Sequence, residues 1–116
     1  MSVKDKIRGC LFGGAAGDAL GYPVEFMDES AIRNTYGAEG IQSYVLTRSH
    51  MDEPGTALFS DDTQMTLFTA WGLFHCPEGE YPRHSVAMAY EDWLDTQEYS
   101  FNLWQKEKKP GFTEVA

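Results

Sequence analysis

The sequence predicts an all-α fold. Helical periodicity, bounded by capping and stop signals, occurs in four segments: residues 6–20, 28–36, 60–74 and 83–97. The one segment that favours an extended conformation, residues 41–46, is short. With 42% hydrophobic and 14% aromatic residues, the chain is also too apolar to be disordered.

The first predicted helix, residues 6–20, carries a regular glycine pattern. Asp5 is a candidate cap, and the Gly21–Pro23 turn ends the helix because proline disfavours helical geometry in the residue before it. Glycines recur every fourth residue and so line one side: Gly9, Gly13, Gly17 and Gly21. Each costs about 1 kcal/mol relative to alanine in a helix interior, so we expect another backbone to pack closely there.

The third predicted helix is apolar on nearly every face over residues 65–74, which predicts deep burial. Ser60 or Asp61 can cap it, and Asp61 with Gln64 has the spacing of a capping box. The helical pattern of the fourth segment is lost after Tyr99.

The second predicted helix is short: it opens at Asp28 and Gly37 closes it. The other predicted helices can hardly cover both the glycine-striped helix and the apolar one. A chain of 116 residues buries only about two-thirds of its unfolded surface. The sequence therefore predicts a single domain, residues 1–116, that is incomplete for its own fold.

Negative charge is concentrated in residues 49–105, which contain ten acids and one base, Arg83. This block accounts for the whole net charge of -9. It argues against nucleic acid or an anionic membrane as a partner. The carboxylates either cover solvated helix faces or include some that bind a cation. Two isolated cysteines, Cys10 and Cys76, and no segment long enough to span a membrane favour a reduced, cytoplasmic compartment.

The segment Ser60–Thr63 is the strongest candidate for chemistry. Two adjacent carboxylates and a hydroxyl at a helix start are hard oxygen donors that suit Mg²⁺ or Mn²⁺. Helix capping and the macrodipole favour the same residues, so both interpretations stay open. By residue type alone, Asp18 is a satisfied polar residue. Glu25, just past a helix-ending turn, is either a solvated acid or an acid presented to a cleft.

Residues 6–97 resemble the ADP-ribosylglycohydrolase family, which includes the dinitrogenase reductase-activating glycohydrolase and the ADP-ribosylarginine and ADP-ribosylserine hydrolases. The segment Arg8–Glu25 is similar to the family's opening, and Ser60–Met65 is similar to its first metal motif. Shorter matches lie between and after these two: Tyr36–Gly37, Ala89–Tyr90 and Trp93–Gln97.

The resemblance implies an all-α fold with a binuclear magnesium centre, in which manganese is sometimes found. It implies hydrolysis of the N- or O-glycosidic bond between ADP-ribose and a protein side chain or small acceptor. By position, Ser60, Asp61 and Asp62 would ligate metal. Glu25 would act in catalysis near the ribose, and Asp18 would have a structural role or support the ligands from behind.

The chain departs from the family in length and in one motif. Family members are more than twice as long and carry a second metal motif, Asp-x-Asp followed by Ser or Thr, which this sequence lacks. The resemblance is therefore to an N-terminal portion, whose activity would need a complementing C-terminal half. The alternatives are a non-catalytic binding or structural member, and a truncated helical module that binds a partner or self-associates.

Overall fold

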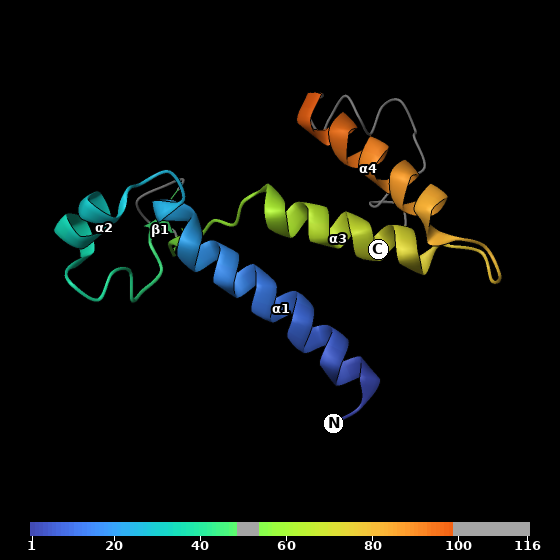
Figure 1. Cartoon of the computed structure of the whole chain (residues 1–116), viewed down its shortest axis with the longest axis horizontal. Coiled ribbons are helices and arrows are strands. Elements are labelled where there is room, and N and C mark those ends of the chain that lie inside the picture. Colours follow the sequence, from blue (N-terminus) through green and yellow to red (C-terminus); the bar gives the residue numbers. More distant parts are fainter. Residues whose placement is uncertain (49–53, 99–116) are drawn as a thin grey trace. The chain divides into compact units, whose positions relative to one another are not determined.

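The computed structural model describes residues 1–48 and 54–98. These residues form four α-helices, one 3₁₀ turn and one pair of short strands (Figure 1). The predicted all-α class is confirmed, with a minimal sheet added. The chain divides into two compact units, Met1–Thr63 and Gln64–Ala116. Within the described ranges, no helix has the length and apolar character needed to cross a membrane.

Helix α1, Val3–Gly21, begins three residues before the predicted start. Ser2 is its N-cap, and the prediction that Asp5 is the cap was wrong. Asp5 instead completes a capping box: its side chain accepts a hydrogen bond from the Ser2 backbone, while the Ser2 hydroxyl accepts one from the Asp5 backbone at 3.1 Å. Hydrogen bonds from Ser2 hold the pKa of Asp5 below its usual value.

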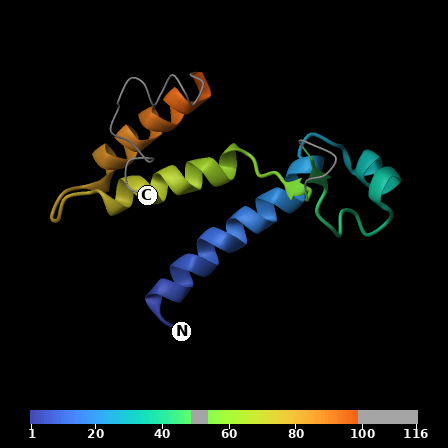
Figure 2. The same ribbon diagram turned by 180° about the vertical axis from the view of Figure 1, so that it is seen from behind.

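The glycine side of α1 has no close neighbour in this unit. A Cβ built at Gly9, Gly13 or Gly17 meets no atom within 4 Å, and Phe12 is 75% exposed. The elements that follow α1 in the first unit lie near its C-terminal end (Figure 2). The close backbone contact predicted for this stripe is therefore absent among the described residues of the first unit, 1–48 and 54–63.

The chain leaves α1 through a tight turn and enters a second helix. The 3₁₀ turn η1, Tyr22–Val24, is followed by α2, Glu29–Tyr36. Asp28 caps α2 by accepting a hydrogen bond from the Ala31 backbone N–H at 2.8 Å. Gly37 ends it with a φ of 92°, which favours glycine. The predicted bounds of this helix are confirmed.

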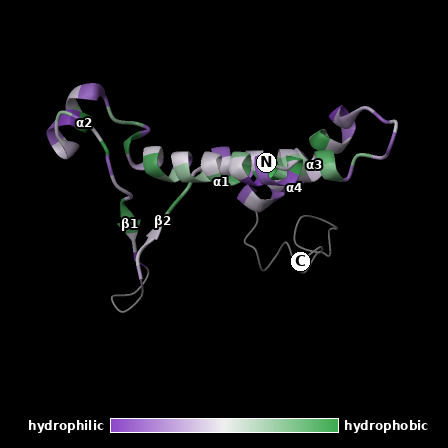
Figure 3. Ribbon diagram, turned by 90° about the horizontal axis from the view of Figure 1, so that it is seen from below, coloured by the Kyte–Doolittle hydropathy of each residue, from purple (hydrophilic) through white to green (hydrophobic). Residues whose placement is uncertain are grey.

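Two short strands, β1 (Leu46–Thr47) and β2 (Thr56–Ala57), pair in antiparallel register, with Leu46 opposite Ala57. They lie side by side in Figure 3. Of the extended segment predicted at residues 41–46, only the last residue belongs to a strand. Thr47 and Thr56 pair instead, because an antiparallel ladder satisfies backbone groups that would otherwise be left to solvent.

Helices α3, Asp61–Phe74, and α4, Pro82–Glu98, pack together in the second unit. They approach closely at Gly72, where an added Cβ would lie 2.7 Å from the Cα of Val86. The close backbone approach predicted for α1 thus occurs on α3. The predicted span of α4 is confirmed to within one residue at each end, and the loss of helical pattern after Tyr99 lies outside the described residues.

Helix α3 is less buried than predicted. Phe68 and, on α4, Ala89 are buried and form the small core of this unit. Leu73 and Phe74, in contrast, are 52% and 80% exposed. Only one helix of the unit, α4, packs on α3 within the described ranges, so a helix that is apolar all round keeps part of its apolar surface in contact with solvent.

Candidate metal and catalytic site

Ser60 immediately precedes α3 and is its N-cap. Its hydroxyl oxygen accepts a hydrogen bond from the backbone N–H of Asp62 at 3.1 Å. This bond satisfies one of the four N–H groups that the first turn of a helix leaves without an internal partner. Ser60 is 6% exposed, so its hydroxyl is held at a defined place at the edge of the helix start.

Asp18 completes this cap from α1. One oxygen of its carboxylate, Oδ2, accepts hydrogen bonds from the backbone N–H of Ser60 at 2.9 Å and of Thr63 at 3.2 Å. The Thr63 hydroxyl donates a third hydrogen bond to the same oxygen. In a capping box, the N-cap and N3 residues satisfy each other's N–H groups. Here a distant carboxylate takes both N–H groups, so two segments of the candidate site are joined directly.

The environment of Asp18 favours its ionised form. Burial raises the pKa of its carboxyl, but the hydrogen bonds from Thr63 and Ser60 together outweigh this effect and leave the pKa below the usual value. Thr63 is 7% exposed and Asp18 is half-buried. A partly desolvated negative charge therefore lies against the first turn of α3, where the helix dipole also favours it.

Asp61 and Asp62 are both exposed in the first turn of α3. The capping box predicted for Asp61 and Gln64 does not form. The Gln64 side chain instead accepts hydrogen bonds from Trp93 at 3.0 Å and from Gln97 at 3.2 Å. Because Ser60 and Asp18 provide the cap, neither Asp61 nor Asp62 is needed for it, and their carboxylate oxygens are available to other groups.

The donor set at this helix start fits a hard divalent cation. Ser60 offers a hydroxyl oxygen, which can accept one hydrogen bond and still bind a cation, and Asp61 and Asp62 offer carboxylates. With Asp18, three negative charges adjoin a helix N-terminus that carries about +0.5 of an elementary charge, so the local charge stays negative. Among the described residues, however, no three His, Cys, Asp or Glu side chains gather into a ready-made metal cluster.

Glu25 lies directly after η1, in helical backbone geometry, and its backbone N–H bonds to the Tyr22 carbonyl at 3.3 Å. The predicted turn is confirmed, and the Glu25 side chain is exposed. The turn is itself attached to α1, because the N–H of Tyr22 bonds to the backbone carbonyl of Asp18. Within the described ranges, the Glu25 side chain makes no hydrogen bond or ion pair with Ser60, Asp61 or Asp62.

A small, mostly apolar cavity of about 220 Å³ adjoins the turn η1, and its wall includes a residue two positions before Ser60. Its walls come from the turn before Glu25, from the β1 region and from the approach to Ser60: Tyr22, Pro23, Val45, Thr47 and Leu58. Sequence reasoning missed Val45, Thr47 and Leu58. Their only signal in the sequence was an apolar or β-branched side chain, which does not distinguish a cavity wall from ordinary packing.

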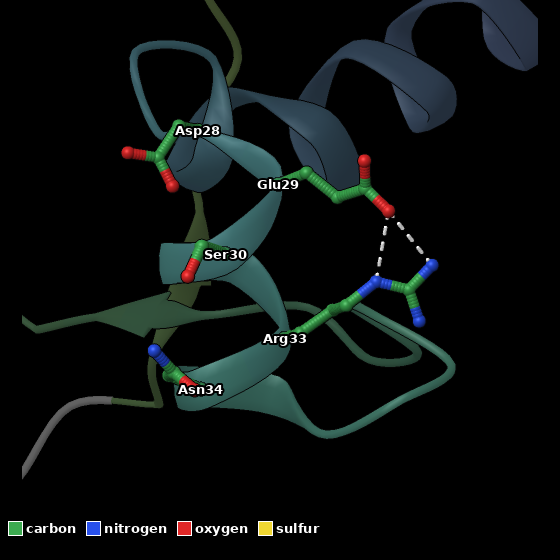
Figure 4. Close-up of a pocket in the computed structure, with 5 residues that line it drawn as sticks. All are labelled: Asp28, Glu29, Ser30, Arg33 and Asn34. Atoms are coloured by element: carbon green, nitrogen blue, oxygen red, sulfur yellow. Dashed lines mark hydrogen bonds and ion pairs between the residues drawn. The ribbon is translucent and has the colours of Figure 1, made fainter.

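A second hollow lies on α2 and has a different character. Figure 4 shows the side chains around it, with Glu29 and Arg33 paired at 2.9 Å. Both side chains are more than half exposed, and Asp28 is occupied as the helix cap. An exposed i,i+4 ion pair of this kind contributes little, about 0.3–0.5 kcal/mol, so this hollow is a solvated helix face.

The model of the ADP-ribosylglycohydrolase family matches residues 1–116. The chain belongs to this family. No curated protein matches the chain, and no solved structure does.

The two segments that carry the similarity to the ADP-ribosylglycohydrolases are in contact in the structure. Arg8–Glu25 covers most of α1, the turn η1 and the residue after it, and Ser60–Met65 covers the N-cap and the first residues of α3. The hydrogen bonds of Asp18 connect them. Family membership carries a general ADP-ribosylglycohydrolase activity with it.

Proposed function

We propose that this chain takes part in Mg²⁺-dependent hydrolysis of the glycosidic bond between ADP-ribose and a protein side chain or small acceptor. Family membership supports the reaction class. One observation supports the metal requirement more than any other. The helix start at Ser60 is capped without Asp61 or Asp62, which leaves two exposed carboxylates beside a hydroxyl.

In this proposal Ser60, Asp61 and Asp62 hold the cation by oxygen donors that Mg²⁺ and Mn²⁺ prefer. When bound, such ions orient hydroxyl groups of a substrate and lower the pKa of a bound water. The chain's own contribution is a rigid presentation of these donors, because the Ser60 and Thr63 N–H groups are anchored on Asp18.

Glu25 has the second role. Departure of a group from the anomeric carbon develops positive, oxocarbenium-like charge on the sugar, which a nearby carboxylate stabilises. Glu25 is exposed at the end of a turn that is hydrogen-bonded to α1, so its backbone is held while its carboxylate stays accessible. The ribose of an ADP-ribosylated substrate would lie between Glu25 and the cation ligands.

The remaining ligands belong to a second acidic motif, Asp-x-Asp followed by Ser or Thr, which residues 1–116 do not contain. We propose that a complementing C-terminal half supplies it, and that the unpartnered glycine side of α1 packs in the completed fold. A reduced, cytoplasmic setting is consistent with Cys10 and Cys76, which are both free thiols.

The test is release of ADP-ribose from arginine-linked and serine-linked ADP-ribosylated protein, measured by chromatography. The full chain is assayed with Mg²⁺, with and without a C-terminal half that carries the second motif. We expect release in the complemented sample, its loss with EDTA, and a loss of about 100-fold or more for Asp61→Asn or Glu25→Gln. Glu29→Gln, an exposed acid on α2, is the matched control and keeps full activity.

Two results would contradict the proposal. The first is an absence of release from both substrates in the complemented sample. The second is full activity of Asp61→Asn, which would leave the exposed carboxylates of the α3 start without a role in the reaction.

A further inference from the structure

The cap of α3 differs from the other caps that the structure describes. Helix α1 is capped by Ser2 with Asp5, three residues away, and α2 by Asp28, three residues from its donor Ala31. The carboxylate that caps α3 comes from 42 to 45 residues away. A local cap only starts a helix, whereas a distant one also fixes where that helix start lies on another element.

Asp18 bonds to the two buried residues of the segment Ser60–Thr63. Its Oδ2 holds Ser60 and Thr63, which are 6% and 7% exposed. Between these two anchors lie Asp61 and Asp62, both exposed. Anchoring the N-cap and N3 positions fixes the backbone of the two residues between them, and so limits where their carboxylates can reach.

Asp18 also connects to the turn that carries Glu25. Its backbone carbonyl accepts the hydrogen bond of the Tyr22 N–H, which joins the end of α1 to η1. The next bond in the turn runs from the Glu25 N–H to the Tyr22 carbonyl. This main-chain bond belongs to the helix and would form with any residue at position 18, whereas the bonds to Ser60 and Thr63 depend on the Asp18 side chain.

From this geometry we propose that Asp18 is a positioning residue for the cation site. It holds the segment Ser60–Thr63 against the last turns of α1, so that the Ser60 hydroxyl and the Asp61 and Asp62 carboxylates are presented together. The inference rests on the proposed function, because it concerns the same ligands. Asp18 acts through its hydrogen bonds to Ser60 and Thr63, which we call the Asp18 clamp. The bond from the Thr63 hydroxyl is an essential part of this clamp.

The test is the affinity of the full chain for Mn²⁺, measured by the broadening of backbone amide signals that this paramagnetic ion causes. Asp18→Asn removes the charge, whereas Thr63→Val removes one donor to Asp18 at constant side-chain shape and charge. We expect each variant to weaken Mn²⁺ binding about tenfold, as for other residues that orient metal ligands. Thr63→Ser keeps the hydroxyl and restores the wild-type affinity.

Two comparisons separate positioning from other effects. Asp28→Asn makes the same chemical change at the local cap of α2, and its Mn²⁺ affinity stays within twofold of the wild type. The double variant Asp18→Asn with Thr63→Val binds Mn²⁺ about as weakly as Asp18→Asn alone, because the Thr63 hydroxyl acts on the site only through its bond to Asp18. Circular dichroism at the titration temperature confirms that each variant keeps its helices, and Thr63→Val with Thr63→Ser carries the test if Asp18→Asn unfolds.

The outcomes distinguish this inference from the proposed function. If the wild type binds Mn²⁺ and Thr63→Val binds equally well, the positioning role is overturned while the cation site stands. A loss of Mn²⁺ affinity in Asp18→Asn but not in Thr63→Val also overturns the positioning role. The charge of Asp18 would then attract the cation directly, without any need for the hydrogen bond from Thr63. A wild type that binds no Mn²⁺ at millimolar concentration overturns the cation site and the positioning role together.

Discussion

The carboxylate of Asp18 accepts a hydrogen bond from the backbone N–H of Ser60 at 2.9 Å, across 42 residues of chain. This bond joins the end of the glycine-rich helix to the start of the helix that carries the acidic motif. It also takes over a capping role for which Asp61 is a candidate by residue type. The consequence is that both neighbouring acids, Asp61 and Asp62, are left exposed.

The first prediction concerns pH. The pKa of Asp18 lies below its ordinary value of 3.8, so its ionised form stabilises the folded chain. This stabilisation is complete above the unfolded pKa and is lost as pH falls through the lower folded pKa. We therefore expect wild type to be more stable than Asp18→Asn at pH 7, and the difference to shrink below about pH 4.

Urea unfolding of both proteins between pH 3 and pH 7 measures this difference directly. Asp28→Asn serves as the reference, because it removes one carboxylate charge, as Asp18→Asn does, and leaves every other charge of the chain unchanged. A stability difference between wild type and Asp18→Asn that grows as pH falls would contradict the assignment.

The second prediction concerns two glycines of opposite environment. An alanine at position 72 places its Cβ 2.7 Å from the Cα of Val86, so Gly72→Ala forces α3 and α4 apart. We expect a loss of about 1–3 kcal/mol in the free energy of unfolding. An alanine at Gly14 meets no atom within 4 Å. Gly14→Ala should therefore stabilise α1, by about 0.5–1 kcal/mol.

Thermal unfolding followed by circular dichroism tests both substitutions in parallel. Equal effects at the two positions would show that helix propensity alone governs them, and would refute the close approach of α3 and α4 at Gly72.

The third prediction concerns the polar contact between Thr69 and Tyr90, whose hydroxyl oxygens lie 2.7 Å apart. Thr69 has one hydroxyl hydrogen and donates it to the Met65 carbonyl at 2.8 Å, so Tyr90 is the donor between the two. Thr69→Val leaves the half-buried Tyr90 hydroxyl without this partner. It should therefore cost more stability, about 1–2 kcal/mol, than Tyr90→Phe, which removes the donor itself.

A double-mutant cycle of these two variants, measured by urea unfolding, reports the coupling. We expect the double variant to be less destabilised than the sum of the single variants. Strict additivity would mean that the two hydroxyls do not interact in solution.

The helices themselves were predictable from local signals. Asp28 and Gly37 bound α2 as expected, because a short polar side chain at the N-cap and a glycine with positive φ at the C-terminal end act within a few residues. Asp5 was misassigned because Ser2 and Asp5 have the same spacing as the residues of a capping box, and the sequence does not say which residue is the cap.

Contacts over long distances were not predictable. The sequence around Asp18 does not indicate Ser60 and Thr63 as its partners. Their hydrogen bonds to Asp18 depend on where α1 places the carboxylate in the folded chain. The glycine stripe of α1 predicted a close approach, but that approach is found at the isolated Gly72. Glycines in a helix allow close packing of a neighbouring backbone, but the sequence does not show at which glycine the packing occurs.

The residues of the candidate site could be predicted from the sequence, but their interactions could not. Ser60, Asp61 and Asp62 were identified by residue type and by resemblance to the family. If Asp61 or Asp62 capped the helix, its carboxylate would bond to backbone N–H groups, whereas a cation ligand needs a free carboxylate. Only the structure shows which partners these carboxylates have. The Gln64 side chain bonds to Trp93 and Gln97, so it does not serve as the partner of Asp61 in a capping box.

The most direct test of the cation site is a titration of the full chain with Mn²⁺, followed by the broadening of each backbone amide signal. We expect broadening to begin at residues 60–63 and to disappear from this segment in Asp61→Asn and Asp62→Asn. Equal broadening along the exposed acids of α4, unchanged in both variants, would contradict the cation site and leave Asp61 and Asp62 as acids of a solvated helix start.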